Sequence, residues 1–161
     1  MRDDAQLRLA IDRYADTVKR ICYIYLKNDA DTEDVFQDVF LKYALFPSAF
    51  SSEEHEKAWL IRITINRCKD VLKSFFHKKV GSLEEARFLA GGSQAEHPDL
   101  LPAVMALPEK YRVVIFLYYY EGYAAPAIAK MLHKKENTIY TNLARAKEQL
   151  RTLLGGDYLE S

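Results

Sequence analysis

Apolar side chains recur at steps of three and four along most of the chain, a spacing that places them on one face of an α-helix. The first run predicts one long amphipathic helix and consists of Leu7, Ile11, Tyr14, Val18, Ile21 and Tyr25. No segment alternates convincingly between apolar and polar residues, as a half-buried strand would. The pattern therefore predicts an all-α fold.

Two further helices are expected in the first half of the chain. We expect Thr32 to cap the second helix with its side-chain oxygen. This helix should end at Phe46, because a residue that precedes a proline, here Pro47, disfavours the helical region. The third helix should span roughly residues 54–76, with an apolar face. That face carries Ile61, Ile65, Cys68, Leu72, Phe75 and Phe76.

A second face of the third helix is basic. Its members adjoin the apolar face and are Arg62, Asn66, Lys69 and Lys73. Residues 62–79 hold six basic residues and one acidic residue, a net charge of +5. The whole chain has 23 basic and 23 acidic residues, so its net charge of zero gives no long-range attraction to nucleic acid. Any binding of nucleic acid must therefore use a local patch such as this face.

Glycine and proline are concentrated between residues 81 and 102, in the segment GSLEEARFLAGGSQAEHPDLLP. Such a composition is typical of a linker. We therefore expect two small helical domains, residues 1–79 and 102–161, joined by a flexible linker over residues 80–101.

The C-terminal domain should contain a small helical bundle. Pro108 suits the first turn of a helix, because the N–H that it lacks would have no partner there. Tyr111–Tyr120 is too continuously apolar for a solvated helix and should be central. Pro126 can open a short helix, and His133 then lies where the chain must turn. We expect Asn137 to cap the last helix.

Two helices joined by a short turn form a helix-turn-helix, in which the start of the second helix enters the major groove of DNA. The last helix should bury Ile139, Leu143, Ala146, Leu150, Leu153 and Leu154. Its candidates for contact with bases are Thr138, Tyr140, Thr141, Asn142 and Arg145. Arg145 can pair with guanine and Asn142 with adenine. A polar helix face is usually only solvated, but this helix and the basic third helix together favour DNA binding.

The sequence offers little for catalysis, metal binding or membrane insertion. Cys22 and Cys68 lie far apart without a CxxC motif, and the four histidines have no metal-ligand spacing. There is no glycine-rich phosphate loop or nucleophile elbow. The longest apolar run, Val113–Tyr120, is far shorter than the ~20 residues of a membrane span. We expect a cytoplasmic protein with no catalytic residues, metal, cofactor or small-molecule substrate, and no direct membrane insertion.

Three motifs carry a resemblance to a known family. They are DADTEDVFQDVFLKYA from Asp29, AWLIRITINRCKDVLK from Ala58, and LPEKYRVVIFLYYYEGYAAPAIAKMLHKKENTIYTNLARAKEQL from Leu107. In this order, over nearly its whole length, the chain resembles bacterial RNA polymerase sigma factors of the two-domain, extracytoplasmic-function group.

The resemblance implies a division of labour. The first motif would dock on the clamp helices of the polymerase β′ subunit through Asp34, Gln37 and Asp38. The second would recognise and open the −10 promoter element through the basic face, Arg62, Asn66, Lys69 and Lys73. In the loop that precedes it, residues 46–56, an unstacked base would be captured, and Phe50 is the stacking candidate, whereas Trp59 is expected to pack internally.

The third motif would read the −35 element through Thr138, Tyr140, Thr141, Asn142 and Arg145. The implied partners are core RNA polymerase, through its β′ clamp helices and β flap, promoter DNA and an anti-sigma factor. Three residues depart from the usual family pattern, namely Ala127, His133 and Asn142. Asn142 stands where arginine is common, which implies a different base preference.

Two other classes of protein remain to be distinguished. A stand-alone helix-turn-helix regulator would bind its operator tightly without polymerase, but it leaves the acidic second helix and the basic third helix unexplained. The neutral net charge favours a subunit whose polymerase supplies further DNA contacts. An enzyme is the third class, and no motif supports it.

Overall fold

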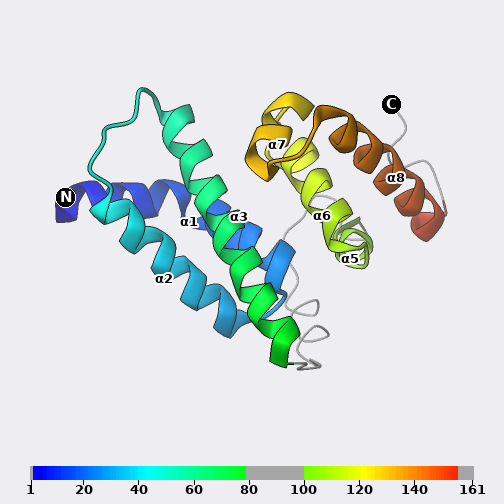
Figure 1. The fold of residues 1–161 in the computed structure, drawn as a ribbon, viewed down its shortest axis with the longest axis horizontal. Coiled ribbons are helices and arrows are strands. Elements are labelled where there is room, and N and C mark those ends of the chain that lie inside the picture. The colour runs from blue at the N-terminus through cyan, green and yellow to red at the C-terminus, as the bar shows by residue number, and fades with distance from the viewer. Residues whose placement is uncertain (1, 79–99, 156–161) are drawn as a thin grey trace. The chain divides into compact units, whose positions relative to one another are not determined.

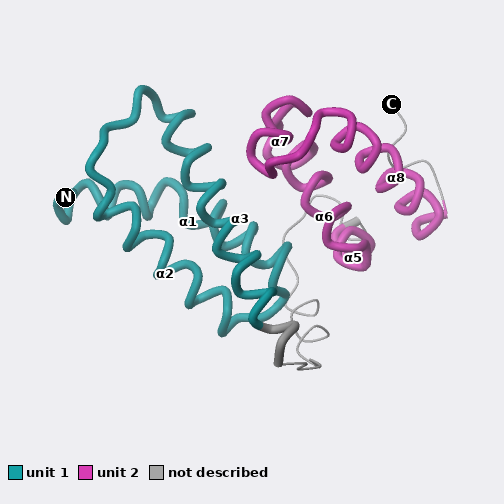
Figure 2. The backbone as a smooth tube through the Cα atoms, viewed as in Figure 1, with its two compact units in different colours: residues 1–85 teal, residues 86–161 magenta. Residues whose placement is uncertain are grey.

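The computed structural model describes residues 2–78 and 100–155, and every regular element within these ranges is a helix (Figure 1). The all-α prediction is confirmed. The chain divides into two compact units, residues 1–85 and 86–161 (Figure 2). The expected linker over residues 80–101 lies outside the described residues except for its last two, which already belong to a helix of the second unit.

Unit 1 is formed by three helices that pack pairwise against one another, α1 (Asp4–Leu26), α2 (Asp29–Leu45) and α3 (Glu53–Lys78). Each contributes apolar side chains to one core, as the spacing predicted for the first and third helices. The apolar side chains that are at most 1% exposed are Val18, Ile21, Cys22, Val35, Val39, Leu60, Ile61, Ile65 and Cys68. The core therefore lies between all three helices.

Helix α2 begins earlier than predicted, and Thr32 is not its cap. The capping residue is Asn28, whose Oδ1 accepts a hydrogen bond of 2.8 Å from the backbone N–H of Asp31. Asn28 is a stronger cap than threonine, and it precedes Thr32 in the chain, so Thr32 lies buried inside the helix. The predicted end is confirmed, because Phe46 leaves the helix with φ −68° and ψ 123°.

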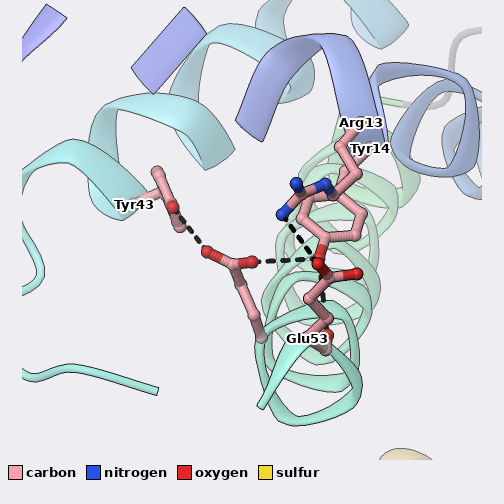
Figure 3. Close-up of polar contacts among 5 residues, drawn as sticks. Arg13, Tyr14, Tyr43 and Glu53 are labelled. Atoms are coloured by element: carbon pink, nitrogen blue, oxygen red, sulfur yellow. Dashed lines mark hydrogen bonds and ion pairs between the residues drawn. The ribbon is translucent and has the colours of Figure 1, made fainter. Parts of the chain in front are cut away.

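One carboxylate links the three helices of unit 1 (Figure 3). Glu56, near the start of α3, accepts hydrogen bonds from the hydroxyls of Tyr14 in α1, at 2.9 Å, and Tyr43 in α2. Arg13 and Glu53 form an ion pair of 3.4 Å beside it. Burial, followed by the bond to Glu56, raises the pKa of Tyr14 from 10 to about 12 and raises that of Tyr43 for the same reasons.

The raised pKa of Tyr14 predicts how the stability of unit 1 depends on alkaline pH. An unfolded tyrosine loses its proton near pH 10 and the folded Tyr14 near pH 12, so the free energy of unfolding should fall as pH rises through this window. Tyr14→Phe should lower stability at pH 8 and make the fall between pH 10 and 12 shallower. Urea unfolding at pH 8, 10 and 11.5 measures both effects, with the exposed Tyr140→Phe as control. An unchanged pH dependence in Tyr14→Phe would contradict this prediction.

Unit 2 contains α5 (Leu100–Met105), α6 (Glu109–Ile115), the π-helical turn η1 (Phe116–Tyr120), α7 (Ala125–Leu132) and α8 (Glu136–Leu154).

The continuous apolar run is central to this unit only in part. Tyr111 to Leu117 are buried, whereas Tyr118, Tyr119 and Tyr120 are 40–43% exposed. Successive helical residues point in different directions, so a run without a polar face cannot bury every side chain against one side. The three tyrosines therefore form an exposed aromatic patch at the end of η1.

Helices α7 and α8 form the predicted turn. His133 adopts the left-handed conformation, with φ 57° and ψ 46°, and the N–H of Lys134 donates to the carbonyl of Ala129 at 2.9 Å. The expected cap at Asn137 is wrong, because α8 begins at Glu136 after Lys135, which provides no side-chain cap. The buried stripe ends earlier than predicted, since Leu153 is exposed and Leu154 is half-buried. It consists of Ile139, Leu143, Ala146 and Leu150.

Candidate nucleic-acid interface

The predicted basic face of α3 lies on one side of the helix, as its spacing requires. At 100° per residue its four members fall within an arc of about 60°. Arg62, Asn66 and Lys73 are exposed and Lys69 is half-buried. This face, which we call the α3 stripe, therefore presents three basic side chains and one amide to a single partner.

An aromatic cluster lies at the loop between α2 and α3, before the start of the α3 stripe. The ring of Phe50 is parallel to that of Tyr43, with an angle of 2° and 6.2 Å between centroids. Phe46 and Trp59 lie 5.4 and 5.5 Å from Phe50, and the ring of His55 meets it edge-on at 5.2 Å. Trp59 packs inside this cluster, as expected from the sequence. Phe50 is half-buried and already takes part in an aromatic stack.

The predicted docking residues of α2 have unequal surroundings. Asp34 and Gln37 are exposed. Asp38 is half-buried, and its Oδ2 forms an ion pair with Nε of Arg67 in α3 at 2.9 Å. Sequence reasoning missed Arg67, because residues 29 positions apart give no local signal of contact. The carboxylate of Asp38 is thus held in place by a neighbouring helix.

Sequence reasoning also missed two leucines on the same side of α2. Leu41 and Leu45 are 59% and 56% exposed, and their helical positions align with that of Asp34. The signal was their steps of seven and eleven residues from Asp34, which place all three within one arc. We call the surface formed by Asp34, Gln37, Asp38, Leu41 and Leu45 the α2 face. It combines two exposed leucines with acidic and amide groups.

In unit 2 the candidate base-reading residues lie at the start of α8. Thr138, Thr141 and Arg145 are exposed, Asn142 is half-buried, and all four fall within an arc of about 100°. Tyr140 is 53% exposed but points about 140–160° away from Thr138 and Arg145 at helical spacing. The structure therefore brings four of the five candidates together and places Tyr140 on another side of α8.

The part of the chain that the structure describes shows neither a group of metal ligands nor a helix that could cross a membrane. Within residues 2–78 and 100–155 no group of three or more histidine, cysteine or acidic side chains could hold a metal ion. The described helices include none with the length and apolarity that crossing a membrane demands. Cys22 and Cys68 are both buried in the core of unit 1.

Comparison with known proteins assigns each unit to a described family. The family model for Sigma-70 region 2 matches residues 10–74, and that for Sigma-70 region 4 matches residues 99–150. The ECF RNA polymerase sigma factor SigM of Mycobacterium tuberculosis is 29% identical over 168 residues, which cover 96% of this chain and 86% of SigM. RNA polymerase sigma factor SigV of Bacillus subtilis is 28% identical over 137 residues, which cover 84% of this chain and 82% of SigV.

Two solved structures share the fold. CnrH in complex with the cytosolic domain of CnrY has a TM-score of 0.65 and 21% identity, and the match covers 96% of this chain and 91% of CnrH. The sigma factor RpoE in complex with the anti-sigma factor NepR, from Bartonella quintana, has a TM-score of 0.64 and 18% identity, with coverage of 94% and 98%. Both family models match in the expected chain order, one in each unit. The chain therefore belongs to the extracytoplasmic-function group of the sigma-70 family, the sigma factors that direct bacterial RNA polymerase to promoters.

Proposed function

We propose that the two units of this sigma factor divide the work of promoter recognition. The N-terminal domain, residues 1–79, docks on the β′ clamp helices of core polymerase and recognises the −10 element. The C-terminal domain, residues 102–161, reads the −35 element. The observation that supports this division most directly is the α3 stripe, which concentrates basic charge on a chain whose net charge is zero.

The −10 element is bound by the α3 stripe and the loop before it. Arg62, Lys69 and Lys73 neutralise phosphates, and Asn66 donates to a base or to the backbone. In an opened duplex an unpaired base must be stabilised outside the base stack. Stacking on an aromatic side chain stabilises such a base by about 1–3 kcal/mol. Phe50 offers its ring for this purpose, because it lies in a loop and is half-exposed.

Core polymerase is bound by the α2 face. The exposed Leu41 and Leu45 supply an apolar centre, and Asp34 and Gln37 supply polar contacts. The ion pair with Arg67 fixes the carboxylate of Asp38, so this acid contributes a pre-oriented acceptor. In unit 2 the exposed tyrosine patch, Tyr118–Tyr120, offers a second surface, suited to the β flap.

The −35 element is read by the first turns of α8. Arg145 pairs with guanine, Asn142 with adenine, and the threonines Thr138 and Thr141 contact either base edges or thymine methyl groups. Tyr140, on another side of the helix, would contact the sugar-phosphate backbone, since it does not share the arc of the other four.

Regulation by an anti-sigma factor completes the proposal. One of the two structural neighbours is the sigma factor RpoE in complex with the anti-sigma factor NepR, and the other is CnrH in complex with the cytosolic domain of CnrY. A partner that covered the apolar centre of the α2 face would block polymerase docking. The chain itself acts in the cytoplasm, with polymerase and promoter DNA, and contributes binding rather than catalysis.

The α3 stripe provides the test. With purified core polymerase, the wild-type chain should give a promoter-dependent runoff transcript. The double variant Arg62→Ala/Lys73→Ala should lower promoter affinity at least tenfold and reduce the slope of log affinity against log salt by about 2, because two phosphate contacts are lost. Filter binding over a salt series measures both quantities.

The matched control is Arg8→Ala/Arg20→Ala, which removes two exposed charges from α1 and should leave both quantities unchanged. Equal losses in the two double variants would show that net charge, and not the α3 stripe, determines the affinity. Tight operator binding by the chain alone, with no runoff product, would instead identify a stand-alone regulator.

A further inference from the structure

Arg2 connects the start of the chain to the end of α2. Its backbone N–H donates to the carbonyl of Ala44 at 2.9 Å. The guanidinium Nη1 donates to the carbonyls of Tyr43, at 3.1 Å, and Phe46, and Nη2 donates to that of Ser48 at 2.9 Å. One residue thus contacts four carbonyls over the last turn of α2 and the first residues of the loop.

These contacts supply hydrogen-bond donors to the C-terminal end of α2. The last four carbonyls of a helix have no N–H partner within the helix, and they carry the negative end of the helix dipole. A guanidinium fits this position because it is always charged and presents its N–H groups in a fixed fork. Hydrogen bonds from a charged donor are about twice as strong as neutral ones. Arg2 therefore acts as a cap for α2, supplied from 41 or more residues away in sequence.

The same guanidinium lies against the aromatic cluster. Its central carbon is 4.4 Å from the ring centroid of Tyr43 and 5.2 Å from that of Phe50. Both distances are within the ~6 Å range of a cation–π contact. Arg2 thus touches both members of the parallel Tyr43–Phe50 stack in addition to the carbonyls at the start of the loop.

We propose that Arg2 is a positioning residue for recognition of the −10 element. Arg2 fixes the loop between α2 and α3 and thereby orients the ring of Phe50. The proposal rests on the role proposed above for Phe50. Arg2 caps only the last turn of α2, and the rest of unit 1 has other support, since α1 is capped by Asp3 and Gln6 and the core includes fully buried side chains from all three helices, such as Val18, Val35 and Ile61. Loss of Arg2 therefore loosens the loop while the folded unit remains.

The first measurement follows the loop without any DNA. Trp59 is the single tryptophan of the chain and lies 4.7 Å from Phe46 and 5.5 Å from Phe50, so its fluorescence reports on the aromatic cluster. In Arg2→Ala, acrylamide should quench Trp59 more strongly than in the wild type, at unchanged helical circular dichroism. The control Arg8→Ala removes an exposed charge from α1 and should leave quenching unchanged.

The second measurement follows promoter opening by the holoenzyme. Permanganate reactivity of unpaired thymines should show that Arg2→Ala lowers the open fraction about tenfold, as expected when several charge-assisted hydrogen bonds are lost. Binding to core polymerase and protection of the −35 element should match the wild type. Arg2→Lys keeps the charge but lacks the fork, so it should behave like Arg2→Ala in both measurements.

The results that would overturn the role of Arg2 differ from those that would overturn the role of Phe50. Wild-type quenching or wild-type opening in Arg2→Ala would overturn the role of Arg2. Full activity of Arg2→Lys would also overturn it, because charge alone would then suffice. Phe50→Ala with wild-type opening would overturn the proposed role of Phe50 and with it that of Arg2, whereas an impaired Phe50→Ala beside a normal Arg2→Ala would overturn only the role of Arg2.

Discussion

Leu41→Asp is expected to abolish transcription by the holoenzyme while leaving the sigma factor folded. Leu41 is 59% exposed in the middle of the α2 face, so an aspartate there remains solvated in the free protein. In the complex the same carboxylate would be buried without a partner. Substitutions at the buried centre of an interface cost about 2–4 kcal/mol, which corresponds to roughly 30–1,000-fold weaker binding.

Titration of fluorescently labelled sigma factor with core polymerase measures this loss directly. The matched control is Leu9→Asp, because Leu9 is 52% exposed on α1, in the same unit, and belongs to no proposed surface. We expect Leu9→Asp to bind core polymerase like the wild type. Equal weakening in both variants would show that added negative charge, and not the α2 face, controls docking, and normal binding by Leu41→Asp would remove Leu41 from the interface.

The second large effect is expected at the −35 element. Arg145→Ala should reduce discrimination between the preferred −35 sequence and its mutant by about 1–3 kcal/mol, roughly 5- to 150-fold, because a bidentate contact to guanine is lost. Binding to core polymerase and opening at the −10 element should persist. Competition binding of the holoenzyme to promoters that differ only in the −35 element gives the ratio.

Arg151→Ala is the control for Arg145→Ala. Both arginines are exposed on α8, but Arg151 lies near its end and pairs with Glu148 at 2.9 Å. Its removal should leave the discrimination ratio unchanged. If Arg145→Ala instead weakens binding to every −35 sequence by the same factor, Arg145 contacts a phosphate and not a base. A second substitution, Asn142→Arg, should then show whether the base preference depends on position 142.

The sequence predicted the helices well because their apolar spacing is a local property. Helix starts were harder, since they depend on which of several nearby polar side chains reaches a free N–H. Asn28 rather than Thr32 caps α2, and no side chain caps α8 although Asn137 is near its start. The π-helical turn at Phe116–Tyr120 had no signal in the apolar pattern, because that pattern is continuous there.

The candidate surfaces divide in the same way. The α3 stripe was predictable, because its members share one helix and follow its period. Contacts between distant residues were not, and these include the ion pair of Asp38 with Arg67 and the contacts of Arg2 with the loop. The two residues of each pair are 29 to 46 positions apart in the sequence, and local periodicity cannot predict contacts over such separations. The roles of the individual residues in promoter binding stay predictions.

The missing cap of α8 has a consequence for the energetics of DNA contact. Side-chain caps satisfy N–H groups in the first turn, and a phosphate that approached a capped helix would have to displace the cap. Lys135 supplies no such acceptor, so no side chain of the capping residue satisfies the first N–H groups of α8. In the proposed complex with promoter DNA, a phosphate oxygen at this position would displace no cap, and it would lie at the positive end of the helix dipole near the charges of Lys134 and Lys135. The first turn of α8 therefore lacks the roughly 1 kcal/mol that a side-chain cap contributes, and under the proposed function a phosphate of the promoter would take the place of that cap.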